Sequence, residues 1–291
     1  MTLSSPDRLR ALLKVDQIIT MPCCFDPLSA KLVEQEGFPL TFMSGFAASA
    51  ARLGMPDTGL MSYGEVVDQG RNICNAVDIP VIGDGDTGYG NALNTKRTVK
   101  GFAQAGFAAV MIEDQLAPKR CGHTAGKAVV DRDEAFERIR AAVDARNEDH
   151  DILILARTDA RHEHGLDEAI SRARQFHELG ADILFVEAPR DRDEMRRICD
   201  ELPGPKMANI IEGGLTPNLS PDELQQLGFQ IVAYPITLIA AAMKAMTGVL
   251  ADLKAGKVAP GCLMPFEEVK TRIGFEDYFE TEMQYGNRKI P

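Results

Sequence analysis

The sequence predicts an α/β protein with the (β/α)8 TIM-type barrel fold. Short apolar runs rich in Val, Ile, Leu and Phe alternate with longer amphipathic stretches along the chain. The apolar runs do not alternate with polar residues, which is the pattern of parallel strands buried on both faces. Eight such units in 291 residues fit a closed barrel, which takes about 250 residues.

The elements follow in order from these runs. Strands are expected at residues 17–21, 40–43, 81–83, 109–113, 152–156, 183–187, 206–209 and 229–233. Helices are expected at 28–36, 63–76, 93–105, 132–147, 166–179, 193–201, 221–227 and 238–254, with a short helix starting near Ser4-Ser5-Pro6. Gly37, Gly106 and Gly180 each stand between a helix and the next strand, as left-handed helix caps do.

The chain has no linker, low-complexity tract or break in composition, so we expect a single barrel domain over 1–291. Residues 255–291 lie beyond the eighth unit and form a helical tail. This tail carries Phe275, Tyr278, Phe279 and Tyr285, which must pack on its own barrel or on a neighbouring subunit.

The charge of the chain limits the kinds of partner that it can bind. There are 32 basic and 43 acidic residues, and no long Lys/Arg run. This balance argues against a nucleic-acid surface and against an anionic membrane surface. Six irregularly spaced cysteines, and an N-terminus without a basic segment before an apolar one, predict a reduced cytoplasmic protein. An anionic partner such as a small-molecule carboxylate would need local cations or a metal to offset this negative charge.

Polar side chains cluster where the predicted strands end. Barrel enzymes place their reactive groups at the carboxyl ends of the strands, so residues far apart in sequence meet there. The residues at these ends are Ser44, Gly45, Asp84, Asp86, Glu113, Asp114, Arg157, Thr158, Asp159, Glu187 and Asn209.

Two carboxylates follow the third strand as Asp84-Gly85-Asp86. Carboxylate oxygens suit Mg²⁺ or Mn²⁺, and Glu113 at the next strand end adds a third. The alternative is a turn in which an Asp binds its own backbone. The sequence predicts a metal site, with Mg²⁺ as the first choice and Mn²⁺ as the second.

The segment Lys119-Arg120-Cys121-Gly122-His123 places a thiol among cationic groups. Neighbouring positive charge favours the thiolate, and the glycines suit a loop that closes over a substrate. The alternative is a structural cysteine in a basic surface loop. Cys121 is therefore the candidate for moving a proton.

Arg157 and Glu187 end two further apolar runs. The planar guanidinium of Arg157 suits bidentate binding of a substrate carboxylate, and Glu187 suits a substrate hydroxyl or the role of a base. The alternative is that these two residues form a structural ion pair with each other.

These residues resemble the signatures of the isocitrate lyase/phosphoenolpyruvate mutase superfamily, and most of all its methylisocitrate lyase-like branch. The similarity runs in order over residues 6–285. Its segments are Ser44-Gly45, Gly54-Met55-Pro56-Asp57-Thr58-Gly59, Asp84-Gly85-Asp86-Thr87-Gly88-Tyr89-Gly90, Glu113-Asp114-Gln115, Lys119-Arg120-Cys121-Gly122-His123, Arg157-Thr158-Asp159-Ala160, Glu187-Ala188 and Glu212-Gly213-Gly214-Leu215-Thr216-Pro217.

The resemblance implies a barrel whose last helix is swapped between subunits of a homotetramer, a dimer of dimers. It implies Mg²⁺ held mainly through water by Asp57, Asp84, Asp86 and Glu113. The implied substrate contacts are Ser44, Gly45, Phe46, Asp84, Gly122, Asn209 and Thr237. The implied catalytic set is Cys121, which protonates the carbanion left by carbon–carbon cleavage, together with Arg157, Glu187 and His123.

The expected activity is a lyase that splits a 2-hydroxy di- or tricarboxylate into pyruvate and a second carboxylic acid. The loop continues Thr124-Ala125-Gly126-Lys127, without the Arg-Pro pair of methylisocitrate lyases, and this departure argues against a third substrate carboxylate. The candidates are a substituted malate such as 2,3-dimethylmalate, or 2-methylisocitrate. The alternatives are oxaloacetate cleavage by hydrolysis or decarboxylation, and phosphonate chemistry of the mutase type.

Overall fold

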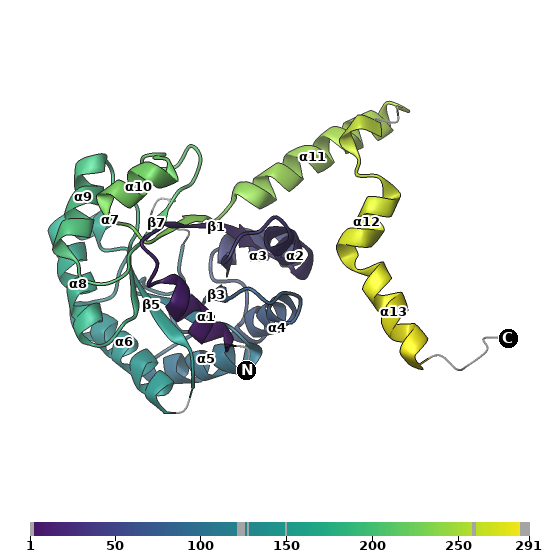
Figure 1. Cartoon of the computed structure of the whole chain (residues 1–291). Helices are drawn as coiled ribbons and strands as arrows, with labels where there is room; N and C mark the ends of the chain where they lie inside the picture. Colours follow the sequence, from purple (N-terminus) through teal and green to yellow (C-terminus); the bar gives the residue numbers. More distant parts are fainter. Residues whose placement is uncertain (1–2, 121–125, 127, 149, 258–259, 286–291) are drawn as a thin grey trace. The chain divides into compact units, whose positions relative to one another are not determined.

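Eight parallel strands form the centre of residues 1–238 (Figure 1). The computed structural model describes residues 3–120, 126, 128–148, 150–257 and 260–285. The strands are β1 (Ile19–Cys24), β2 (Thr41–Met43), β3 (Val81–Asp84), β4 (Ala109–Glu113), β5 (Leu153–Thr158), β6 (Ile183–Val186), β7 (Met207–Asn209) and β8 (Ile231–Tyr234).

The sheet closes into a barrel. Its order is β6-β5-β4-β3-β2-β1-β8-β7, and a parallel bridge from Leu184 to Lys206 joins the two end strands. The amide of Leu184 donates to the carbonyl of Pro205 at 2.9 Å across this seam. The predicted (β/α)8 barrel is therefore confirmed, because every strand is parallel to its neighbours and the two edges meet.

Helices surround the strands in this unit (Figure 1). They are α1 (Ser5–Leu12), α2 (Pro27–Gln35), α3 (Gly45–Leu53), α4 (Tyr63–Cys74), α5 (Ala92–Ala105), α6 (Arg132–Asn147), α7 (Arg161–His164), α8 (Leu166–Glu178), α9 (Arg192–Glu201) and α10 (Pro221–Leu227). Ser4 caps α1, which starts where the sequence places it.

Alternation along the strands separates an inner from an outer core. On β4, Val110 and Ile112 pack in the cluster between strands and helices, whereas Met111 belongs to the cluster inside the barrel. Glu113 comes two residues after Met111, and side chains two apart lie on the same face of a strand. This register directs the carboxylate of Glu113 inward at the end of the barrel.

The structure contains a helix that the sequence pattern did not predict. α3 begins directly after Ser44, whose hydroxyl accepts a hydrogen bond from the amide of Ala47, and ends at Gly54 with φ +64°. The helix is built from small residues, so it lacks the large apolar stripe on which the helix predictions relied. Strand positions also shift by a few residues, for example Ile19–Cys24 for the predicted 17–21.

Residues 239–291 form a second compact unit. α11 (Thr237–Lys254) spans the start of this unit, and the unit continues with η1 (Pro260–Cys262), α12 (Phe266–Ile273) and α13 (Phe275–Tyr285). None of the residues of α12 and α13 is buried. Among the described residues, no helix is both long enough and apolar enough to cross a bilayer.

Candidate active site

A cavity opens where the barrel strands end, and every strand contributes to its wall. The side chains from the strands are Cys23, Phe42, Asp84, Met111, Glu113, Arg157, Phe185, Met207, Asn209 and Ala233. Helix α3 adds Phe46, and the loops add Ser44, Asp57, Lys119, Arg120, Glu187, Ile211, Pro235 and Ile236. The cavity thus has an apolar floor inside the barrel and a charged rim at the strand ends.

Asp84 and Asp86 form the acidic side of the rim. The Oδ1 atom of Asp84 accepts from the amide of Asp86 at 3.1 Å, and its Oδ2 atom accepts from the amide of Gly45 at 3.2 Å. A Cβ at position 45 would lie 2.5 Å from Asp84 Oδ2, so only glycine lets the start of α3 approach this carboxylate. Asp86 has φ +47°, a strained conformation of the kind that clusters at functional sites.

Lys119 joins this acidic side from the loop after β4. Its Nζ lies 2.7 Å from Oδ1 and 2.8 Å from Oδ2 of Asp57, and 2.7 Å from Oδ1 of Asp86. The Lys119 side chain is only 5% exposed. We call Asp57, Asp84, Asp86 and Lys119 the aspartate cluster. It holds three carboxylates and one ammonium group.

Burial in this cluster shifts the titration of its members. Loss of water raises the pKa of Asp86 to about 7, although the ammonium of Lys119 opposes the shift. Burial disfavours the charged form of Lys119, but Asp86, Asp84 and Asp57 outweigh it and hold the pKa of that lysine well above its usual range. The lysine therefore stays charged, and a proton or a further cation would relieve the excess of carboxylate.

Arg157 lies on β5, two strands along the rim from Asp84 on β3, and is surrounded by three carboxylates. It forms a bidentate pair with Asp159, with Nε 2.7 Å from Oδ2 and Nη2 3.0 Å from Oδ1. It also lies 3.3 Å from Glu113 and 3.3 Å from Glu187. The structural ion pair with Glu187 considered from the sequence is therefore present. Within the described residues these contacts use Nε and Nη2 of Arg157.

Glu113 lies between the two sides and is 2% exposed. Burial raises its pKa well above the usual range, although Arg157 opposes the shift. Its Oε2 atom faces Arg157, and its Oε1 atom has no hydrogen-bond partner among the described residues. A buried carboxylate oxygen without a partner is costly, so this oxygen suits a water or cation that completes the site.

Some of the other predicted substrate contacts line the cavity and one does not. Ser44 and Phe46 line the cavity, and Asn209 does so while its amide donates to Glu187 Oε2 at 3.5 Å. Thr237 is not part of the cavity wall, and its hydroxyl donates to Glu212 at 2.8 Å. Cys121, Gly122 and His123 lie outside the described residues.

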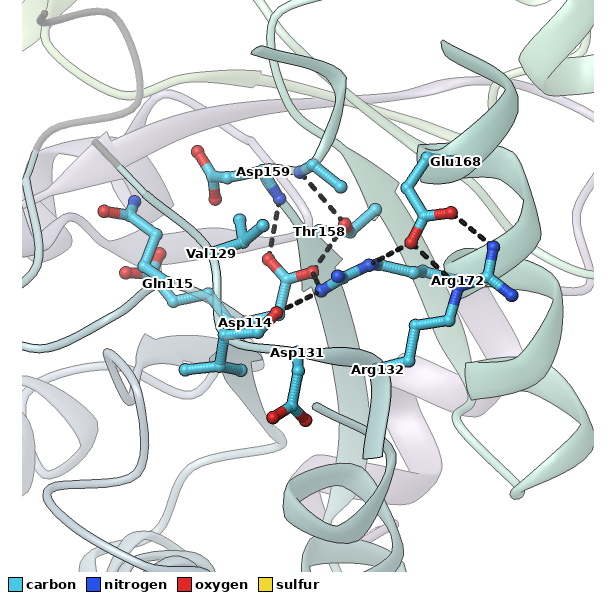
Figure 2. A network of polar contacts seen from close by, with 12 residues as sticks. Asp114, Gln115, Val129, Asp131, Arg132, Thr158, Asp159, Glu168 and Arg172 are labelled. Atoms are coloured by element: carbon cyan, nitrogen blue, oxygen red, sulfur yellow. Dashed lines mark hydrogen bonds and ion pairs between the residues drawn. The ribbon is translucent and has the colours of Figure 1, made fainter. Parts of the chain in front are cut away.

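A second charge network joins Asp114 and Thr158 to Arg172 on α8 (Figure 2). Asp114 accepts from the hydroxyl of Thr158 at 2.7 Å, from the amide of Asp159 at 2.9 Å and from Nη1 of Arg172 at 3.0 Å. Glu168 in turn faces both Arg172 and Arg132. We call the set Asp114, Arg132, Thr158, Glu168 and Arg172 the arginine network. It pairs two carboxylates with two guanidinium groups.

The carboxylates on the acidic side of the rim are suitable ligands for a divalent cation, although they are not already arranged as a coordination sphere. No three His, Cys, Asp or Glu side chains are arranged as direct metal ligands in the part of the chain that the structure describes. The buried oxygens of Asp57, Asp84, Asp86 and Glu113 are nevertheless hard ligands in excess of the nearby positive charge, and Mg²⁺ is usually bound with several of its waters retained. These four residues would hold such a hydrated ion.

Sequence reasoning missed two features of this site. It treated Lys119 only as a neighbour of Cys121, although the side chain pairs with Asp57, 62 residues away in sequence. It also did not pair Arg157 with Asp159, although residues two apart at a strand end share a face. That spacing was the available signal for the second feature, whereas no spacing rule links Lys119 to Asp57.

The comparisons with known proteins agree with this geometry. The phosphoenolpyruvate phosphomutase family matches residues 9–254. A 2,3-dimethylmalate lyase from Eubacterium barkeri is 41% identical over 96% of this chain and 97% of its own length. A solved oxaloacetate acetylhydrolase, in complex with 3,3-difluorooxalacetate, is 33% identical with a TM-score of 0.94 over 99% of both chains. A phosphonopyruvate hydrolase solved with oxalate and Mg²⁺ is 30% identical with a TM-score of 0.86 over 97% of this chain and 99% of that one.

Proposed function

The chain belongs to the isocitrate lyase/phosphoenolpyruvate mutase superfamily, in its methylisocitrate lyase-like part, and from that membership we propose a Mg²⁺-dependent carbon–carbon lyase. Carbon–carbon lyases are among its relatives at 36–41% identity. The proposed reaction splits a 2-hydroxy dicarboxylate such as 2,3-dimethylmalate into pyruvate and propionate. 2-Methylisocitrate, which would give pyruvate and succinate, is the larger candidate.

One observation carries the proposal. The cavity presents an excess of buried carboxylate on one side and the guanidinium of Arg157 on the other. A bound cation on the acidic side would take up negative charge that develops on the substrate oxygens. Arg157 would orient a substrate carboxylate, because Asp159 fixes the plane of its guanidinium. The two sides can therefore hold the two ends of a 2-hydroxy acid.

The proton transfers are assigned to two residues. Glu187, beside Arg157 and Asn209, would accept the proton of the substrate 2-hydroxyl as the bond between C2 and C3 breaks. The electron pair of that bond stays on C3, and the thiol of Cys121 would return a proton there to give the second acid. His123 and Gly122 belong to the same proposed loop contact, and Ser44, Gly45 and Phe46 to the substrate side of the cavity.

The apolar wall supports a substituted malate. Phe46, Ile211, Pro235 and Ile236 line the cavity, so the described wall offers apolar contact for methyl groups of a substrate. The sequence after His123 also lacks the Arg-Pro pair of methylisocitrate lyases, whose arginine could hold a third substrate carboxylate. This is why we place 2,3-dimethylmalate before 2-methylisocitrate.

The test is product analysis with Mg²⁺ on 2,3-dimethylmalate, 2-methylisocitrate, citramalate and oxaloacetate. We expect one substrate to give pyruvate and its partner acid in equal amounts. Cys121→Ser should lower turnover by at least about 100-fold while substrate still binds, whereas Cys262→Ser, at an exposed cysteine, should not. Pyruvate release that survives Cys121→Ser unchanged would remove the thiol from the mechanism.

Hydrolysis of oxaloacetate is the second candidate, favoured by the likeness over 99% of both chains to an oxaloacetate acetylhydrolase. In that case oxaloacetate and water would give oxalate and acetate. Phosphonate chemistry, suggested by the name of the matching family, would instead form or break a P–C bond and tolerate loss of Cys121. The same product analysis separates all three.

We also propose that the protein is a cytoplasmic homotetramer, a dimer of dimers in which the tail, residues 255–291, packs on a neighbouring copy of this chain. The support is the exposure of Phe266, Tyr278, Met283 and Tyr285 on α12 and α13. The five described cysteines are all free thiols, as expected in a reducing compartment. A monomer at micromolar concentration in sedimentation would contradict the assembly.

A further inference from the structure

The ammonium of Lys119 lies between two carboxylates that would hold a metal ion, Asp57 and Asp86. Its ammonium group lies within 2.7–2.8 Å of oxygens of both Asp57 and Asp86. Its side chain is 5% exposed, so this contact is enclosed rather than a passing surface pair. In the protein without a bound metal, the ammonium of Lys119 is thus the positive charge that faces Asp57 and Asp86.

The space around Nζ is limited on its other side as well. A Cβ built on Gly45 would lie 3.5 Å from Nζ and 2.5 Å from Asp84 Oδ2, so the start of α3 closes over the ammonium and the third carboxylate. Mg²⁺ that keeps its waters is larger than an ammonium group, because each oxygen stands about 2.0–2.1 Å from the ion. A hydrated ion placed between Asp57 and Asp86 would therefore meet Nζ, which already lies 2.7 Å from an oxygen of each residue.

The charges lead to the same conclusion. Three carboxylates of the cluster and the unpartnered Oε1 of Glu113 exceed the single charge of Lys119, so the cluster can bind more positive charge than the lysine supplies. A divalent ion would supply it, but a +2 ion and an ammonium within a few ångströms repel each other strongly. A divalent ion would therefore bind to the carboxylates by displacing the ammonium of Lys119.

We propose that Lys119 is an internal stand-in for the divalent cation, and that the metal and the ammonium of Lys119 are alternative occupants of the space between Asp57 and Asp86. The inference rests on the metal site of the proposed function. Lys119 then offsets part of the carboxylate charge until a metal binds, and in the metal-bound protein the lysine is released. Nothing in this exchange requires substrate.

The first test measures Mg²⁺ binding by calorimetry in EDTA-treated protein. Lys119→Met should bind Mg²⁺ at least about tenfold more tightly than the unaltered protein, because the competing cation is gone. Lys100→Met removes the same charge from an exposed position and should change the affinity by less than about twofold. Equal affinity in the two variants would overturn the proposal.

The second test needs no variant, so it holds even if Lys119→Met folds only with metal. Acetylation of lysines is followed by mass spectrometry with and without saturating Mg²⁺. Without Mg²⁺, Lys119 should react at least about tenfold more slowly than Lys100, and with Mg²⁺ the difference should largely disappear. Continued protection of Lys119 under saturating Mg²⁺ would show that the metal and the lysine coexist, which overturns the inference alone. Absence of Mg²⁺ binding to the unaltered protein would overturn both the inference and the metal site on which it rests.

Discussion

The two charge networks at the rim of the barrel are built in opposite ways. The arginine network balances two carboxylates with two guanidinium groups. Its central carboxylate, Asp114, accepts hydrogen bonds from three groups. The aspartate cluster sets three carboxylates against the single ammonium of Lys119. A balanced buried network supports the scaffold, whereas a network with excess charge is completed by a ligand.

The two networks should therefore respond differently to the loss of a charge. Neutralising a carboxylate in the balanced network leaves a buried cation without its partner, so stability should fall. Neutralising a carboxylate in the aspartate cluster relieves repulsion, so the metal-free protein should keep its stability while the chemistry fails. Single substitutions in each network can separate these two outcomes.

Asp86→Asn should separate function from stability. We expect turnover to fall by at least about 100-fold, because a metal-facing carboxylate is lost. The free energy of unfolding in EDTA should stay the same or rise, because three carboxylates of the cluster face one ammonium and the loss of one negative charge relieves their repulsion. Asparagine also tolerates the positive φ at this position. The measurements are steady-state kinetics and urea unfolding, and a marked loss of stability would contradict the comparison.

Asp114→Asn should do the reverse and destabilise the fold. The side chain of Arg172 is 4% exposed and would keep its charge without this partner. Breaking a buried pair from one side costs about 3–5 kcal/mol, and Glu168, which still faces Arg172, places the expected loss at about 3 kcal/mol. Urea unfolding of Asp114→Asn beside Asp86→Asn checks this, and equal stability of the two variants would refute the distinction between the networks.

Thr158→Val should give a smaller loss in the same network. The hydroxyl donates to Asp114 at 2.7 Å and accepts from the amide of Ala160 at 3.2 Å. Valine keeps the shape but removes both bonds, and we expect a cost of about 1–2 kcal/mol in unfolding free energy. The chemistry should be little changed. A large fall in turnover without loss of stability would instead place Thr158 in the substrate site.

The smallest expected effect is the contribution of Glu168 to the free energy of unfolding, which should depend on pH. Hydrogen bonds from Arg132 and Arg172 lower its pKa to about 2. The unfolded chain, with a pKa near 4.5, takes up the proton first, so the stabilising contribution is full above about pH 5 and is lost as the pH falls toward 2. Partial exposure limits it to about 1 kcal/mol. The stability difference between the unaltered protein and Glu168→Gln should therefore shrink from pH 5 to pH 3.5, and a constant difference would exclude this contribution.

The sequence was sufficient for the barrel and for the residues at the strand ends. Runs such as Ala109–Glu113 are apolar on both faces, and parallel strands of one barrel must bring their carboxyl ends to the same rim. Ser44, Asp84, Glu113, Arg157, Glu187 and Asn209 were found for that reason, and all line the cavity.

The pairing of these residues could not be predicted in the same way. Asp114, Thr158 and Arg172 come from the end of β4, from β5 and from α8, and their contact depends on how the helices pack against the barrel. The contact of Lys119 with Asp57 depends likewise on two loops that no sequence period relates. α3 was missed because its small residues carry no large apolar stripe, although Ser44 and Gly54 are caps that a search for helix ends could have used.

A Mg²⁺ titration of EDTA-treated protein would decide whether the aspartate cluster is a cation site, with pyruvate release from 2,3-dimethylmalate and thermal stability followed in the same samples. We predict no turnover without the metal, full recovery on its addition, and one Mg²⁺ concentration dependence for turnover and stabilisation. Undiminished pyruvate release in EDTA, with a melting temperature that ignores Mg²⁺, would contradict the assignment of the aspartate cluster as a cation site that serves the chemistry.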